Sequence, residues 1–255
     1  MLLPLSKLVG YTIKGLDGDA GEVHDLYFDR SDWGVSYVVV DTGGWLLGRR
    51  VLLSPHALEP PDADARVVPA SLTREQIRHS PEVDFARPVT LQQLSELHHY
   101  YGWPAYVYWS TDTPAAPGRT MVYTTGAALS TIVTDESLNA ADGGELLPPE
   151  PEVSLHSARQ VATYRATTRE GPVGRVRDLL LDAIEWRFAY LVLQPPRELG
   201  GGAVLVESSW VEAIDWAQER LVLRLGRGRI SDAPRFDDAT TLDEPYLRRV
   251  SDHLR

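Results

Sequence analysis

Short stretches rich in apolar residues alternate with turns that contain glycine and proline over residues 9–69. Aromatic and β-branched residues dominate some of them, as at positions 37–40, and such residues favour extended backbone. Five strands are therefore predicted, over residues 9–14, 22–29, 35–41, 50–53 and 66–69. Short strands at this spacing predict a small barrel or sandwich, and closure of a barrel leaves no exposed strand edge.

Two later stretches have sequence patterns that are typical of helices. Thr73 is followed three residues later by Gln76, which is a capping-box pattern, and Pro81 ends the short helix that it predicts. A second pattern of this kind starts at Thr90 and leads into apolar residues at helical spacing. Gly102 and the proline two residues beyond it end that second helix.

The chain also repeats itself. Residues 18–84 and 171–237 align without a gap, and 20 of the 67 positions are identical. Chance would give only a few matches, so the sequence predicts two homologous domains separated by a segment that is not repeated. In the second copy the stretch 226–230 is rich in glycine and lacks the capping box, so the pattern there does not support a helix. The identical pairs include Gly18/Gly171, Gly21/Gly174, Asp25/Asp178, Asp29/Asp182, Trp33/Trp186 and Tyr37/Tyr190.

Residues kept in both copies indicate packing requirements, because a catalytic site more often survives in one copy only. Gly18 and Gly21 lie in a turn where a positive φ angle is expected. Trp33 and Trp186 precede the third strand of each copy, where a large ring is expected to seal one end of the barrel. Four sections of chain follow from the repeat: a first barrel domain at 1–87, a helix, aromatic segment and linker at 88–152, a second barrel domain at 153–240, and a tail at 241–255.

The segment between the copies changes character along its length. Its first part holds six aromatic residues within positions 100–109. From position 111 to 152 proline, alanine, glycine, serine, threonine and aspartate dominate, which predicts a long, loosely ordered linker. Within it, residues 121–123 and 129–133 are expected to form brief strands or to dock onto a barrel.

These segments resemble the PRC-barrel family. The resemblance is carried by the strand at 21–29, the strand at 37–41, the stretch at 48–55, and the helix at 72–77 with the residues that follow it. The sequence at 100–104 is similar to the inter-domain segment of a bacterial subgroup with two such barrels. The resemblance covers about residues 5–109 and 155–237. It implies a mainly β protein with two small antiparallel PRC-type β-barrels, a few short helices and a long linker.

The family includes the cytoplasmic domain of the photosynthetic reaction-centre H subunit and the C-terminal domain of a ribosome-maturation factor. Their roles are protein binding or electrostatic tuning, and the family carries no shared catalytic motif. This chain lacks the membrane helix of the former and the other domain of the latter. The resemblance therefore implies a non-enzymatic role.

Net charge and composition limit the classes of binding partner that we expect. The formal net charge is −11, which repels nucleic acid and anionic membranes, so neither is expected as a partner. The chain has no cysteine, which excludes disulfides and thiolate metal sites. It has neither a signal peptide nor an apolar run long enough to span a membrane, so we expect a cytoplasmic protein without stable membrane insertion.

A search for chemistry finds no catalytic, cofactor or metal site. His98 and His99 are neighbours on a predicted helix and point about 100° apart, which does not suit chelation of one metal ion. Asp25 and Asp29, like their counterparts in the second copy, lie about 13 Å apart along a strand, too far for a glycosidase pair. We expect them to cap turns or pair with arginine. Nucleophile-elbow and phosphate-loop motifs are also missing from the sequence.

Two stretches are candidate interaction surfaces. The loop that begins at Gly43 combines a tryptophan and two leucines with two arginines, a mixture typical of interface anchors. Its alternative is that Trp45 folds back over the barrel. The aromatic segment is the second candidate, and its alternative is packing between or onto the domains. The candidate residues are Trp45, Arg49, Arg50, Tyr100, Tyr101, Trp103, Tyr106 and Trp109.

The sequence thus favours an interaction or adaptor protein that binds another protein or forms a homodimer. Two alternatives stay open. One is a small-ligand or enzymatic site in the cleft between the barrels, which requires polar groups that converge there. The other is a stress-related or H-subunit-like regulatory protein in which the linker mediates assembly.

Overall fold

The computed structural model divides the chain into two compact units, one formed by Met1–Ser71 with His156–Arg255 and the other by Leu72–Leu155. The residues described are all except 44–48, 82, 84–88, 90, 104–106, 111–119, 126–127, 134–154, 238–241 and 255. The side chains of 91–92, 107–110, 120–125 and 128–133 also lie outside the description.

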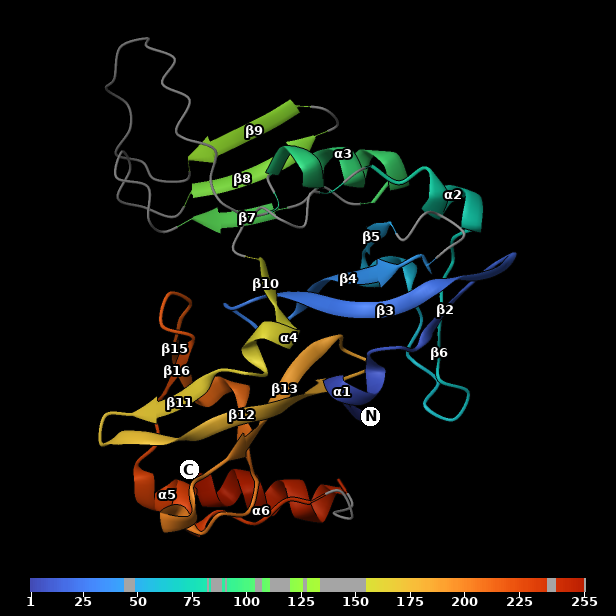
Figure 1. Cartoon of the computed structure of the whole chain (residues 1–255). Helices are drawn as coiled ribbons and strands as arrows, with labels where there is room; N and C mark the ends of the chain where they lie inside the picture. The colour runs from blue at the N-terminus through green and yellow to red at the C-terminus, as the bar shows by residue number, and fades with distance from the viewer. Residues whose placement is uncertain are drawn as a thin grey trace, which may run out of the picture. The chain divides into compact units, whose positions relative to one another are not determined.

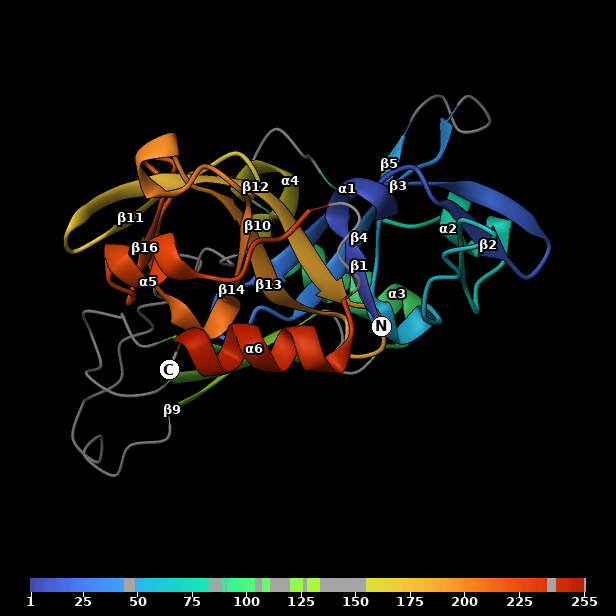
Figure 2. The same cartoon turned by 90° about the horizontal axis from the view of Figure 1, so that it is seen from below.

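The first unit is mainly β and holds two curled sheets, each the shape of a half-barrel (Figures 1 and 2). The first sheet has the order β5-β4-β3-β2-β6. All the strand segments predicted from the first copy are present in it. Its strands are β2 (Thr12–Gly15), β3 (Gly18–Asp29), β4 (Val35–Asp41), β5 (Arg50–Leu53) and β6 (Val67–Pro69).

The second sheet repeats this arrangement and extends it by one strand, with the order β14-β13-β12-β11-β16-β15. Both sheets are mostly antiparallel, but each contains one parallel pair, β2 with β6 and β11 with β16. The sheets are therefore of mixed type, and the predicted antiparallel type is not confirmed. The strands are β11 (Arg165–Thr168), β12 (Gly171–Asp182), β13 (Arg187–Gln194), β14 (Val204–Glu207), β15 (Val211–Asp215) and β16 (Arg220–Leu223).

The sequence repeat reappears as a repeat of local structure. Thr12 lies opposite Glu22 in the first sheet, and Arg165 lies opposite Arg175, 153 positions later, in the second. Positive φ angles recur at the same offset, for example at Trp33 (62°) and Trp186 (48°). Because left-handed backbone is uncommon in a bulky residue, its recurrence shows that the duplication preserved detailed backbone geometry.

The first strand of each repeat pairs with the sheet of the other repeat. The short strand β1 (Leu2–Pro4) pairs with β12 of the second repeat, and α1 (Leu5–Leu8) follows it. Correspondingly, β10 (Leu155–Ser157) pairs with β3 of the first repeat, and α4 (Ala158–Val161) follows it. The two repeats therefore extend each other's sheets in a reciprocal manner.

Helices complete the hydrophobic core of the second repeat. Tyr246, Val250 and Leu254 of α6 (Glu244–Leu254) are buried in the same cluster as the strands. The stretch where no helix was supported forms α5 (Arg227–Asp232). That expectation was wrong because Ile230 is fully buried in the core, and tertiary packing of this kind outweighs the low helix propensity of glycine.

The other compact unit contains both predicted helices, one from the end of the first copy and one from the segment that follows it. α2 (Arg74–Arg78) has the capping box, and α3 (Leu91–Tyr101) is followed by Gly102 at a φ of 65°. A three-stranded antiparallel sheet also lies in this unit. Two of its strands fall in the stretch predicted as a linker, at the places where brief strands were predicted. The strands are β7 (Val107–Ser110), β8 (Thr120–Thr125) and β9 (Ala128–Val133).

Candidate interaction surfaces

Asp25 is a buried carboxylate in the region where the two repeats contact each other, which we call the join. It is 7% exposed and lies beside a β-bulge in β3. The hydroxyl of Ser157, in the second repeat, donates to its Oδ2 at 2.6 Å, and the backbone N–H of Arg159 donates to its Oδ1 at 3.1 Å. The N–H of Leu26 donates to the same Oδ1 at 2.8 Å. The carboxylate thus holds the first turn of α4 against β3.

Asp178 makes the reciprocal contact. The backbone N–H of Ser6 donates to its Oδ1 at 3.2 Å, and the hydroxyl of Ser6 donates to its Oδ2. The N–H of Leu179 donates to Oδ1 at 2.8 Å, as Leu26 does to Asp25. Because Ser6 occupies the position of Arg159 in the repeat, both backbone contacts are equivalent, and the identical aspartates serve one structural purpose.

The tryptophans that both copies share take part in the same join through their backbone. The N–H of Val35 donates to the carbonyl of Trp186 at 2.7 Å, and the N–H of Phe188 donates to the carbonyl of Trp33 at 2.9 Å. Phe188 and Val35 are themselves equivalent positions, so the two bonds form a symmetric pair. The Trp33 ring stacks on Phe28 at 5.0 Å between centroids. The backbone of the shared tryptophans therefore joins the repeats, a contact that the sequence did not indicate.

The second pair of shared carboxylates caps turns. Asp29 Oδ1 accepts a hydrogen bond from the N–H of Ser31 at 2.7 Å. Asp182 Oδ1 accepts one from the N–H of Ile184 at 3.0 Å. The prediction of turn capping is confirmed for this pair.

His156 is held neutral beside the join. Its ring stacks on Trp216 at 3.4 Å between centroids and meets the edge of Phe28 at 6.1 Å. Burial lowers the pKa of His156 to about 4, and the opposing effect of Asp29 is smaller. Its Nε2 is buried and has no hydrogen-bond partner among the described residues. The side chain therefore acts as an aromatic packing element rather than as a titrating base at neutral pH.

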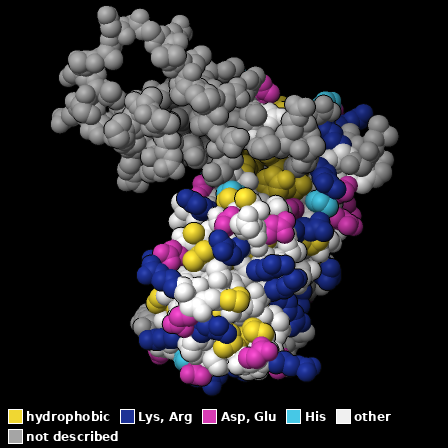
Figure 3. All heavy atoms as spheres, turned by 60° about the vertical axis from the view of Figure 1, so that its left-hand side comes forward, with side chains coloured by type: hydrophobic (Ala, Val, Ile, Leu, Met, Phe, Trp, Pro, Cys, Tyr) yellow, Lys and Arg dark blue, Asp and Glu magenta, His cyan; other side chains and the backbone are white. Residues whose placement is uncertain are grey.

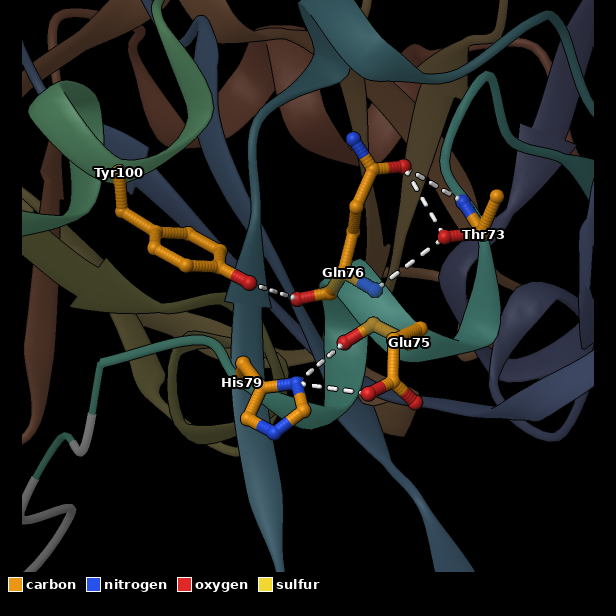
Figure 4. Close-up of polar contacts among 5 residues, drawn as sticks. All are labelled: Thr73, Glu75, Gln76, His79 and Tyr100. Carbon is orange, nitrogen blue, oxygen red and sulfur yellow. Dashed lines mark hydrogen bonds and ion pairs between the residues drawn. The ribbon is translucent and has the colours of Figure 1, made fainter.

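Part of the predicted aromatic surface forms a compact cluster in the other unit, at the end of α3. Tyr101 stacks on Trp103 at 4.3 Å, and Tyr100 meets Tyr101 edge-on at 4.8 Å. Figure 4 shows the Tyr100 hydroxyl directed at the carbonyl of Gln76, to which it donates at 2.8 Å. Tyr100 is nevertheless 38% exposed. One ring of the cluster is thus available at the surface while its hydroxyl is anchored to α2.

The remaining candidate residues differ in exposure, and some of them lie outside the described residues. Trp45 and Tyr106 lie outside the described residues, as does the side chain of Trp109 in β7. Arg49 is half-buried, and its carbonyl accepts hydrogen bonds that close the base of the loop. Arg50 is exposed at the start of β5. The structure therefore places Arg49 and Arg50 in one unit and Tyr100, Tyr101 and Trp103 in the other.

A positive region lies near the join as well. Burial lowers the pKa of His24, and the charges of Arg50 and Arg159 lower it further. The guanidinium of Arg159 also donates to the carbonyl of His24 at 3.2 Å. The arginine of the predicted loop thus belongs to a small cationic area that includes a residue of the second repeat, which the sequence could not bring together.

Other kinds of site find little support in the described part of the chain. No group of three or more histidine, aspartate or glutamate residues there is arranged to hold a metal ion. No helix among these residues is both long and apolar enough to cross a membrane. An open hollow of about 390 Å³ lies at the end of β16, lined by Arg169, Glu170 and residues 223–226.

Comparison with known proteins does not narrow the function, because neither a protein-family model nor a curated protein matches the chain.

Proposed function

We propose that the chain is a non-enzymatic interaction or adaptor protein of the cytoplasm, built from two PRC-type barrels that act as one rigid body. The observation that carries this proposal is the reciprocal join. Asp25 and Asp178, the carboxylates that both repeats retain, are fully used in holding Ser157, Arg159 and Ser6 in place. Polar groups committed in this way serve architecture rather than chemistry.

The partner on this proposal is another protein, and a second copy of the chain is one form that it takes. Interface anchors are typically aromatic residues and arginines that keep an exposed portion. Arg50 at the start of β5 and Tyr100 at the end of α3 have that character. Among the described residues of the two surfaces predicted from the sequence, these two are the exposed ones.

Cross-linking followed by mass spectrometry tests the proposal in the full chain. We expect a reproducible set of cross-linked proteins, or of cross-links between two copies, that is lost in Arg50→Ala or Tyr100→Ala. Arg248→Ala, at an exposed position of α6, is the matched control and retains the set.

A double variant at the join distinguishes the adaptor function from an enzymatic one. Asp25→Asn with Asp178→Asn keeps hydrogen-bonding side chains at both positions, so partner recovery is expected to match that of the natural chain. A small-molecule turnover that the natural chain has and this double variant lacks, with the fold intact by circular dichroism, would contradict the proposal.

A further inference from the structure

A row of three arginines crosses neighbouring strands of the second repeat. Arg175 on β12 lies opposite Arg165 on β11, and Arg165 lies beside Arg220 on β16. Residues in register on adjacent strands point to the same face of a sheet, and all three side chains are exposed. Neighbouring strands lie about 4.8 Å apart, so the three Cα atoms span about 10 Å. We call this set the arginine row.

The arginine row is not explained by internal pairing. Arg220 forms an ion pair with Asp215 on β15, at 2.9 Å. Within the described chain, no hydrogen bond or ion pair engages the guanidinium groups of Arg165 and Arg175. Like charges directly opposite each other destabilise a sheet, so the row reduces stability rather than adding to it.

The fold does not require arginine at these positions. In the first repeat the same register places Glu22 opposite Thr12 and Thr12 beside Val67. Equivalent positions therefore hold an acid, a hydroxyl and an apolar side chain in one sheet and three cations in the other. A difference of this kind between two copies of one fold points to a function that only the second copy has.

The charge of the second repeat suits an anionic ligand. Residues 153–255 contain 15 arginines and 15 acidic residues, so the net charge of −11 lies entirely in the rest of the chain. Figure 3 shows cationic side chains, in dark blue, interspersed with acidic ones, in magenta, over the described surface. An anion is therefore not repelled from the second repeat as it is from the remainder.

We propose that the arginine row binds an acidic segment of a protein partner through its glutamate and aspartate carboxylates. Guanidinium groups pair with carboxylates in a bidentate manner, and such charge-assisted bonds are stronger than neutral ones. A short peptide fits three cations, whereas nucleic-acid binding proteins commonly make about six to ten phosphate contacts. The net charge of −11 also opposes the approach of a long polyanion. The biological use of the row rests on the proposed interaction function.

Fluorescence anisotropy with labelled hexaglutamate tests the arginine row on the full chain. The swap variant Arg165→Thr with Arg175→Glu introduces the residues that the first repeat has, so the sheet is expected to accept them. We expect its affinity for hexaglutamate to be at least about tenfold lower, which corresponds to about 1.4 kcal/mol. The control Lys7→Thr with Arg248→Glu changes the net charge equally at exposed positions outside the row and is expected to keep the natural affinity.

Several outcomes would overturn the proposal. They are equal affinity in the swap variant, equal loss in the control, and no binding of hexaglutamate by the natural chain at low salt. Binding of hexathymidylate that depends on the row, without binding of hexaglutamate, would assign the row to nucleic acid instead. None of these results bears on partner recovery through Arg50 or Tyr100, so failure of this inference is distinguishable from failure of the proposed function.

Discussion

At the scale of single residues, Asp25 shows how a buried charge is tolerated. Burial raises the pKa of its carboxyl, and hydrogen bonds from Ser157, Arg159 and Leu26 oppose the shift without cancelling it. Ionisation at neutral pH therefore costs folding free energy, while the three accepted hydrogen bonds keep the group in place. The side chain acts through its geometry more than through its charge.

Asparagine and alanine are expected to differ strongly at this position. Asp25→Asn keeps an oxygen for the two N–H donors, and its amide donates to the Ser157 hydroxyl. Asp25→Ala leaves those buried groups unpaired, which costs about 1–3 kcal/mol. Urea unfolding at pH 7 is expected to show Asn at or above the natural stability and Ala well below it.

The pH dependence gives a check on the Asn variant. Since the folded-state pKa of Asp25 is raised, its contribution to stability is present below its unfolded pKa and is lost as pH rises through the folded value. Any advantage of Asp25→Asn is therefore greatest near neutral pH and shrinks on acidification. An advantage that grows on acidification would contradict the assignment.

His156 produces a pH dependence of the opposite sign. Its folded pKa of about 4 lies below the usual 6.5, so the stability it contributes is complete above pH 6.5 and is lost as pH falls toward 4. His156→Phe keeps the aromatic stacking on Trp216 and removes the titration. Urea midpoints measured between pH 7 and 5 are expected to fall less steeply in this variant than in the natural chain. Parallel slopes would show that another group titrates.

Residue patterns predicted local roles better than distant ones. Turn capping by Asp29 was predictable because the acceptor and the donor, Ser31, are two positions apart. The role of Asp25 was not, because its partners lie more than 130 positions away and only the folded arrangement brings them together. The same reason explains why the sequence did not indicate the backbone bonds that Trp33 and Trp186 accept across the join.

At the scale of elements, glycine positions fix the close approach of strands. Gly21 has a φ of 131°, and a Cβ atom there would lie 2.3 Å from the carbonyl oxygen of Asp41. Gly174 has the same relation to Gln194 in the second repeat, at 2.2 Å. The sequence indicated the positive φ of this turn, but not that neighbouring backbone leaves no room for a side chain.

Alanine at Gly21 is therefore expected to be far more damaging than alanine at Gly10. Gly10 also has a positive φ, of 85°, but nothing lies within 4 Å of the added methyl group. Strain alone costs about 1 kcal/mol at Gly10, whereas Gly21→Ala must also move the backbone of β4. Thermal unfolding of both variants compares the two costs, and equal losses would contradict the steric explanation.

Strand segments and capped helices were predictable at this scale, because each depends on residues close in sequence. The capping box of α2 formed as predicted, and α3 ended at Gly102. The helix α5 was missed because its formation depends on the burial of Ile230 in a core assembled from distant strands.

At the scale of the whole molecule, the join is expected to make both repeats unfold together. The Phe188 ring, from the second repeat, meets Phe28 of the first edge-on at 5.5 Å and is fully buried. Phe188→Ala removes this contact at a cost of about 3–5 kcal/mol.

Hydrogen exchange measured by mass spectrometry shows which strands lose stability in this variant. Phe188→Ala is expected to lower the protection of β3 and β4 in the first repeat as well as that of β13. Leu223→Ala, in the core of the second repeat away from the join, is the matched control and is expected to affect mainly its own sheet. Loss of protection confined to β13 in Phe188→Ala would show that the repeats are not coupled.

The reciprocal join also has a consequence for how the molecule diverged. A surface that matches itself joins two identical subunits equally well, but in such a homodimer every substitution occurs twice. Once both subunits share one chain, each half changes independently, and a position can hold Glu22 in one half and Arg175 in the other. The two halves of a single chain are thus free of the symmetry that binds a homodimer, and one half can take on a role of its own while the other keeps the residues of the scaffold.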